Sequence, residues 1–301
     1  MKKAIFFITF SLFLVNYMFS QMLTITFADY TTKTPLANIL LTSNSKPIGI
    51  SDNRGTVIVD KSLIVDNKIK PFSYLYATDE ISLLDSDNKI KIELLQFEEI
   101  KTEIKDIPAF FAPIMKLARK SPNFTANYRV DQFGEYNIFQ EPRKFVRKEF
   151  KNDIILTFKK KFTVKSNDGV IGDTAKNIFE QTYLCDIIRN NTEEIFTQPD
   201  KYIFQINRIV KNDDLGCDVY DISIRSNDVT EKSIVANLLL TSGKVLQFYK
   251  EILRTNAQVH IPKSIFIYSN TKNEIPLYIE TYQILSDDTQ RVISSNKLYL
   301  K

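Results

Sequence analysis

Apolar and polar residues alternate with a period of two in short runs along the first part of the chain. The first run covers residues 23–27, and later apolar runs lie at 36–41, 48–50, 56–59, 72–76 and 90–95. Alternation of this kind indicates strands with one buried face. Turn residues separate the runs at intervals of roughly 8–12 residues, which is typical of antiparallel sandwiches. The pattern therefore predicts a small β-sandwich over residues 21–97.

Longer strands are predicted in the second part of the chain, over residues 123–301. Within 218–225, Tyr220, Ile222 and Ile224 share one face and alternate with polar or charged residues. One packed face and one wet face indicate an antiparallel sheet. The predicted architecture is mainly β, with a large curved sheet that resembles a half-barrel. The other predicted strands lie at 128–130, 136–140, 154–164, 202–210, 233–240, 245–252, 265–268, 277–285 and 297–300.

A linker containing one helix is predicted between the two β-regions, over residues 98–122. Phe111, Ile114, Met115 and Leu117 form an apolar stripe with helical spacing. Pro122 ends the helix because the residue before a proline avoids the α region.

The first residues of the chain have the order of a secretory signal peptide. Lys2 and Lys3 precede an apolar stretch at 4–15, and Ser20–Gln21 offers a cleavage point after residue 20. The alternative is an uncleaved N-terminal anchor. No later segment reaches the roughly 20 apolar residues of a membrane-spanning helix. We therefore expect an exported protein that is periplasmic, outer-membrane-associated or extracellular.

The first β-region carries a recognisable series of residues. Pro35-Leu36-Ala37-Asn38-Ile39 is followed by Gly49 and by Ser51-Asp52-Asn53-Arg54-Gly55, with strand runs between them. In this series the chain resembles the carboxypeptidase-regulatory-like domain, a small transthyretin-like β-sandwich. It departs from the pattern at Asn38, where a small residue is commoner, and at Val57, where an aromatic is usual. The resemblance implies a scaffold without peptidase activity.

The second β-region resembles a group of exported proteins of Gram-negative bacteria, in which a regulatory-like domain precedes a helix and a β-rich domain. The matching pieces lie at 112–120, 126–129, 202–206, 219–224 and 236–246. The region is also similar in style to the curved sheets of periplasmic lipoprotein-carrier proteins. The molecular function of the group is mostly unassigned, so the resemblance implies little beyond an exported location.

Charge gives no general argument for binding nucleic acid or an anionic membrane. The chain has 40 basic and 36 acidic residues, and two of the basic residues lie in the predicted signal peptide. We expect no nucleic-acid partner. One segment is strongly basic. It either binds a glycolipid or another polyanion, or it is the solvent-facing side of two strands. Its basic residues are Arg143, Lys144, Arg147, Lys148, Lys151, Lys159, Lys160 and Lys161.

No catalytic, metal-binding or cofactor-binding set is predicted. His260 is the only histidine, and no nucleophile motif accompanies it. Acid pairs such as Asp213 and Asp214 lie in polar stretches, and tryptophan, which often stacks on sugars, is absent. Segments 52–55 and 85–88 lack a complete calcium loop and indicate turns.

Two smaller hypotheses concern side-chain pairing and an apolar surface. Cys185 and Cys217 form a disulfide or remain two buried thiols. The interior of the curved sheet is either a binding surface for an acyl chain or simply part of the core. The residues that would contact the acyl chain are Phe204, Ile206, Tyr220, Ile222 and Ile224. We therefore expect a non-enzymatic protein acting in binding, scaffolding or assembly, with an envelope protein or glycolipid as partner. The alternatives are a carrier of a hydrophobic ligand and, after it, a hydrolase.

Overall fold

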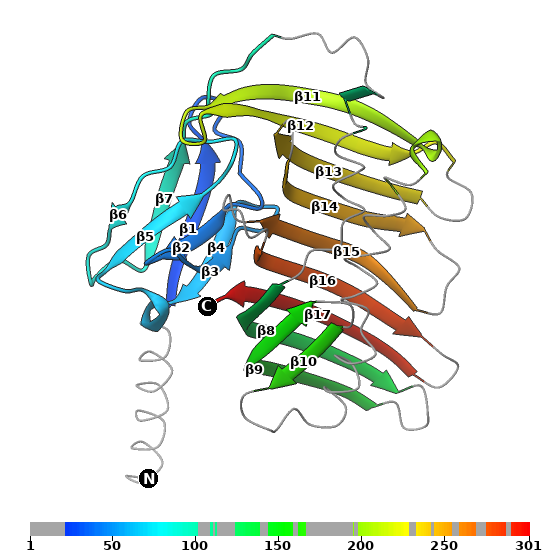
Figure 1. Ribbon diagram of the computed structural model, residues 1–301. Helices are drawn as coiled ribbons and strands as arrows, with labels where there is room; N and C mark the ends of the chain where they lie inside the picture. The colour runs from blue at the N-terminus through cyan, green and yellow to red at the C-terminus, as the bar shows by residue number, and fades with distance from the viewer. Residues whose placement is uncertain are drawn as a thin grey trace. The chain divides into compact units, whose positions relative to one another are not determined.

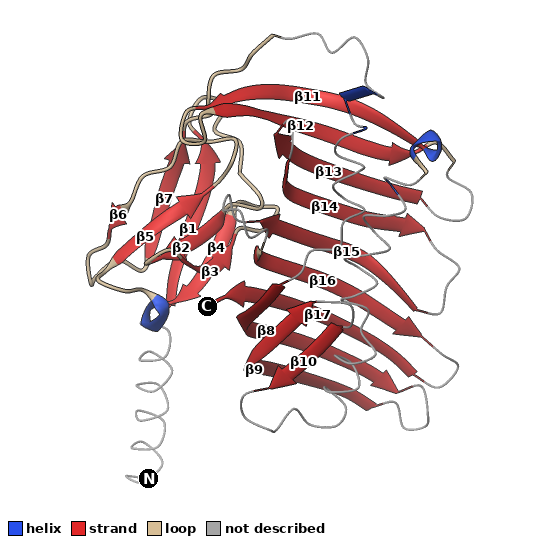
Figure 2. Cartoon of the chain, in the orientation of Figure 1, coloured by secondary structure: helices blue, strands red, loops and turns tan. Residues whose placement is uncertain are grey.

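The computed structural model confirms that the chain is mainly β. It describes residues 22–101, 109–110, 112, 124–138, 144–158, 162–166, 195, 198–228, 233–241, 244–254, 259–268, 275–286 and 290–301. Figure 2 shows that strands dominate the described part of the chain. The chain divides into two compact units between Phe97 and Glu98. The predicted signal peptide lies outside the described residues, and so does most of the predicted linker helix, of which Ala109, Phe110 and Ala112 are helical.

The first unit contains two sheets with the strand orders β4-β1-β7 and β3-β2-β5-β6 (Figure 1). Its largest buried apolar side chains come from β1, β2 and β5. Strand β1 pairs in parallel with β7, and the other pairings are antiparallel. The strands are β1 (Met22–Asp29), β2 (Leu40–Ser43), β3 (Lys46–Ile50), β4 (Thr56–Asp60), β5 (Lys68–Phe72), β6 (Ile81–Ser82) and β7 (Lys89–Leu94).

The turn between β3 and β4 is held by the residues that carry the family resemblance. The Ser51 hydroxyl donates to the Leu36 carbonyl at 2.7 Å and accepts the Ile39 N–H at 2.9 Å. The Asp52 carboxylate accepts the N–H groups of residues 54 and 56, both at 2.9 Å. Gly55 has φ 71°, a conformation that favours glycine. Asp52 therefore has a turn role here.

The two departures from the family pattern have local explanations. Asn38 has φ 62°, and asparagine tolerates this left-handed conformation better than most residues. Val57 belongs to β4 and lies against Gly49 of β3. A Cβ atom at Gly49 would lie 2.6 Å from Val57 Cγ2, so this part of the sandwich is already filled by the valine.

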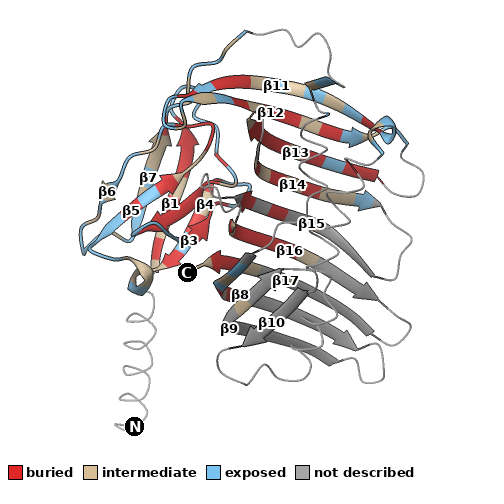
Figure 3. Ribbon diagram, viewed as in Figure 1, coloured by how far each residue is buried: buried red, intermediate tan, exposed pale blue. Residues whose placement is uncertain are grey.

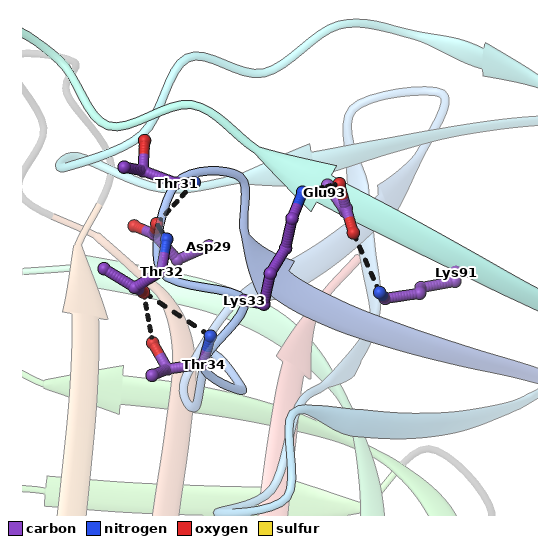
Figure 4. A network of polar contacts seen from close by, with 7 residues as sticks. All are labelled: Asp29, Thr31, Thr32, Lys33, Thr34, Lys91 and Glu93. Atoms are coloured by element: carbon purple, nitrogen blue, oxygen red, sulfur yellow. Dashed lines mark hydrogen bonds and ion pairs between the residues drawn. The ribbon is translucent and has the colours of Figure 1, made fainter.

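A polar turn follows β1 and is organised by one carboxylate (Figure 4). The Asp29 carboxylate accepts the N–H groups of Thr31 at 2.8 Å and Thr32 at 2.7 Å. Lys33 then pairs with Glu93 of β7 at 2.6 Å. The Thr32 and Thr31 N–H groups lower the pKa of Asp29 from its ordinary value of 3.8, although burial opposes this shift.

We predict that Asp29 makes the stability of the first unit depend on pH in acid solution. A lowered folded-state pKa means that the contribution is complete above the unfolded-state value and is lost as the pH falls through the folded-state value. The free energy of unfolding of the wild type should therefore fall more steeply below about pH 4 than that of Asp29→Asn. Urea unfolding at a series of pH values measures this. Parallel curves for the two proteins would contradict it.

The second unit contains one antiparallel sheet of ten described strands, in the order β10-β9-β8-β17-β16-β15-β14-β13-β12-β11. The sheet is curved, as predicted (Figure 1). Strands β11 to β17 form a meander, and β17 then pairs with β8. The strands are β8 (Phe124–Ile138), β9 (Lys144–Phe158), β10 (Phe162–Ser166), β11 (Tyr202–Asn212), β12 (Cys217–Ser226), β13 (Ser233–Thr241), β14 (Lys244–Arg254), β15 (Val259–Tyr268), β16 (Pro276–Ser286) and β17 (Gln290–Leu300).

Part of the outer edge of β11 is covered by the start of the second unit. The Ile100 N–H donates to the Ile209 carbonyl at 2.8 Å, and the Lys211 N–H donates to the Glu98 carbonyl at 2.9 Å. Covering an edge in this way satisfies backbone groups that would otherwise be free to pair with another chain.

Candidate binding surfaces

One face of the ten-stranded sheet holds an apolar cluster on the described side chains of β8, β11 to β14, β16 and β17, and we call it the apolar face. Register places Phe204 beside Ile224 and Ile206 beside Ile222, and these pairs continue onto β13 at Ala236 and Leu238. The five residues predicted to contact an acyl chain are therefore brought together. They belong to a larger cluster whose buried members are Tyr128, Val130, Ile195, Tyr202, Ile222, Ile224, Ile234, Ala236, Leu238, Leu240, Phe248, Ile279 and Leu298.

Coverage of the apolar face varies within its β11–β12 end. Ile222 and Ile224 are fully buried, whereas Phe204, Ile206 and Tyr220 are only half-buried. The ring of Phe110 packs against Tyr220 with 4.7 Å between the ring centroids. Ile222 and Ile224 thus act as core, while the other three predicted residues keep apolar surface in contact with water. We call Phe204, Ile206 and Tyr220 the open end of the apolar face.

A buried lysine interrupts the apolar face, and the sequence analysis did not single it out. Lys250 is 1 % exposed, and register places it between Ala236 of β13 and Ser264 of β15. Thr281 of β16 follows Ser264 in the same row and is also 1 % exposed. Period-two counting from Phe248 places residue 250 on the apolar face.

The opposite face, at β11 to β13, carries a polar network centred on Asp221. The buried Asp221 carboxylate accepts from Arg208 Nε at 2.9 Å, from Asn237 Nδ2 at 2.6 Å and from Asn207 Nδ2 at 3.1 Å. Asn207 lies where the register of β11 shifts against β12, so a β-bulge places it beside the acid. The network joins three strands and uses its polar groups internally.

A second buried polar layer lies further along the same face. The Tyr278 hydroxyl donates to Glu280 at 2.7 Å, and Lys263 approaches Glu280 at 3.4 Å. Arg129 stacks over the ring of Tyr299 at 4.3 Å from its centroid. Burial raises the pKa of Tyr278 well above its ordinary value, so this phenol stays protonated as a donor. The layer stabilises the sheet through internal pairing.

The basic segment is only partly described, and its role stays a prediction. Arg143 and residues 159–161 lie outside the described residues, while Lys144, Arg147, Lys148 and Lys151 belong to β9. Register places Arg147 opposite Glu135 and Lys151 opposite Asp131 of β8. Two of the basic residues thus occupy positions directly opposite acids, which favours cross-strand pairing.

The candidate catalytic residues do not form a described constellation. His260 occupies a register position opposite Ile284, and Asp213 and Asp214 lie in the exposed β11–β12 turn. Within the described part of the chain, no group of three potential ligands could hold a metal ion. Cys217 begins β12 and is half-buried, and Cys185 lies outside the described residues, so their disulfide stays a prediction.

Comparisons with known proteins give only remote similarities. No family model matches the chain, and no curated protein matches it significantly. The chain is similar to a LolA superfamily protein from Nitrosomonas europaea, with 12% identity, 62% of this chain and 92% of that chain covered, and a TM-score of 0.22. It is also similar to MucB bound to MucA(peri), with 8% identity, coverage of 65% and 94%, and a TM-score of 0.20.

The MucA/MucB complex of Pseudomonas aeruginosa gives a similar result, with 8% identity, coverage of 64% and 93%, and a TM-score of 0.21. Similarity of this size assigns neither a family nor a function to the chain.

Among the helices that the structure describes, none is long and apolar enough to cross a membrane.

Proposed function

We propose that this is an exported, non-enzymatic protein of the cell envelope that acts by binding, in scaffolding or assembly. The observation that carries the proposal is the open end of the apolar face. Phe204, Ile206 and Tyr220 belong to a buried apolar cluster but are themselves only half-buried. A partner that covers them gains roughly 25 cal/mol for each Å² of apolar surface removed from water.

The polar residues near the open end support binding through apolar contact. Asp221 and its three donors satisfy one another on the opposite face of β11 to β13. The open end itself is formed by Phe204, Ile206 and Tyr220, and this polar network lies on the other side of the sheet. Buried aromatic side chains, such as Phe204 and Tyr220 would become on binding, are typical anchors of interfaces.

The first unit fits a supporting role in the same proposal. Ser51, Asp52 and Gly55 stabilise a turn, as expected for a domain of the carboxypeptidase-regulatory-like type. We propose that this unit is such a domain and acts as a scaffold.

The second candidate is a carrier of a hydrophobic ligand, and the row containing Lys250 and Thr281 favours it. This row places buried polar groups within the apolar face, next to Phe248 and Ile279 in the neighbouring row. A ligand that enters this face would place an acyl chain against the apolar row and a polar head group toward the buried polar row. Both candidate functions use the same face of the sheet. They differ in whether the bound partner is a protein or a lipid-like ligand.

Photo-crosslinking from the open end tests the proposal. A benzophenone amino acid replaces Phe204 in the protein expressed in its own cells, with the same amino acid at Ile58 as control. Ile58 belongs to the first unit and is 61% exposed, so it reports random encounters. We expect a discrete adduct from position 204 that position 58 does not give.

The mass of the adduct distinguishes the two candidates. An adduct of protein size supports the scaffold or assembly role, and an adduct of lipid size supports the carrier. Identical adducts at both positions, or none at position 204, would contradict binding at the open end.

A further inference from the structure

The exposed apolar side chains of the second unit are gathered at one corner of the sheet. Of the residues described in this unit, three large apolar side chains are exposed: Ile203 (42%), Val235 (39%) and Leu253 (57%). They lie near the same ends of β11, β13 and β14, where Figure 3 shows exposed residues at the tips of β12 and β14. Exposed apolar patches of this kind mark interaction surfaces.

The same corner carries two opposite charges on either side of Val235. Register runs from Ile203 of β11 to Arg225 of β12, then to Val235 of β13 and Glu251 of β14. Cross-strand partners share a sheet face, and this row lies on the face opposite the apolar face. We call these four residues, together with the exposed Leu253 at the β-bulge near the end of β14, the corner patch.

The two charges of the corner patch differ in their surroundings. Arg225 is exposed, and it makes no ion pair with any residue that the structure describes. Glu251 is half-buried, and the Tyr249 hydroxyl donates to its Oε2 at 2.7 Å, which fixes the orientation of the carboxylate. A guanidinium that approaches Glu251 would meet an oriented acceptor, which favours a strong charge-assisted hydrogen bond.

We propose that the corner patch is a self-association surface that binds a second copy of this chain. Along the row the residues are positive, apolar and negative in that order. A two-fold rotation about an axis beside Val235 therefore brings each charge opposite a residue of the opposite charge in the second copy. Arg225 of each copy then faces Glu251 of the other, and the two Val235 side chains meet at the axis. A two-fold interface needs this self-complementarity, because the same patch is used on both copies.

The charge balance argues for a second copy over an anionic membrane. The row holds one positive and one negative residue, and the exposed Lys201 at this end is adjacent to the exposed Asp200. Among the side chains that the structure describes at this corner, positive and negative charges balance, so they give anionic lipid no net attraction. The patch also has far fewer residues than the roughly 20–30 per side of a standard interface, so the dimer should be weak and concentration-dependent.

Sedimentation equilibrium of the mature chain over a range of high micromolar concentrations tests the proposal. We expect a monomer–dimer equilibrium in the wild type. Arg225→Glu and Glu251→Arg should each weaken the dimer by tenfold or more, because each places like charges opposite one another. The double variant Arg225→Glu/Glu251→Arg should restore the wild-type dissociation constant to within about threefold, because the pairing is only exchanged.

Two controls separate loss of association from loss of folding. Thermal unfolding of each variant checks the fold, and Ile58→Asn removes an exposed apolar residue of the first unit without touching the patch. A wild type that stays monomeric, single variants that dimerise like the wild type, or a double variant that fails to recover would each overturn the proposal. Binding to vesicles of phosphatidylcholine and phosphatidylglycerol in place of self-association would do the same.

Discussion

Gly55→Ala is expected to destabilise the first unit by about 3 kcal/mol or more. A Cβ atom at this position would lie 2.4 Å from the backbone carbonyl oxygen of Phe27, which cannot move aside as a flexible side chain could. The Gly55 carbonyl also accepts the Phe27 N–H at 2.8 Å, so moving the turn would disturb the pairing of β1. The positive φ of 71° adds backbone strain for alanine. Urea unfolding measures the change.

Gly216→Ala is the matched control for this prediction. Gly216 has a similar φ of 63°, but a Cβ atom there would meet nothing within 4 Å. This variant carries the conformational cost alone, which is about 1–2 kcal/mol. Equal losses of stability in the two variants would show that the contact with Phe27 is unimportant and would contradict the prediction.

Asp221→Ala is expected to cost the second unit about 2–4 kcal/mol of unfolding free energy. The substitution removes the acceptor shared by Arg208, Asn207 and Asn237 and leaves donors on three strands without it. The side chain of Asp221 is 5% exposed, whereas that of Arg208 is 31% exposed, so water can recover part of the arginine's hydrogen bonding. We therefore expect less than the loss of a fully buried pair.

Asp218→Ala tests whether the effect comes from the network. Asp218 lies on the same strand, is exposed and pairs in register with Lys211. Its removal should change the unfolding free energy by less than about 0.5 kcal/mol. If the two aspartate variants unfold at the same urea concentration, the network does not hold the three strands together.

The sequence predicts the strands and faces well where the hydrophobic pattern is regular. The alternation at Tyr220, Ile222 and Ile224 places these residues on one face, and the structure brings them to the apolar cluster. The turn at residues 51–55 can be predicted equally well, because Asp52 and Gly55 are residue types that this backbone conformation favours. Both features depend on local chemistry, which a sequence displays directly.

Features that depend on distant parts of the chain could not be predicted in the same way. The pairing of β17 with β8 joins residues far apart in sequence, and no local pattern encodes it. The β-bulge at Asn207 shifts the register, and it thereby places Arg208 opposite Asp221. Period-two counting places Lys250 on the apolar face, but its neighbours Ser264 and Thr281 in the polar row are set by the pairing of β14, β15 and β16.

Native mass spectrometry of the mature protein, purified gently from its own envelope fraction, tests the central claim most directly. We predict that the wild type carries a bound species, that Phe204→Asp loses it because a charge enters the open end of the apolar face, and that Ile58→Asp retains it. A bound species with the mass of a lipid would favour the carrier function, and one with the mass of a protein would favour the scaffold function. A wild type without any bound species, or a Phe204→Asp variant that binds as the wild type does, would contradict the account.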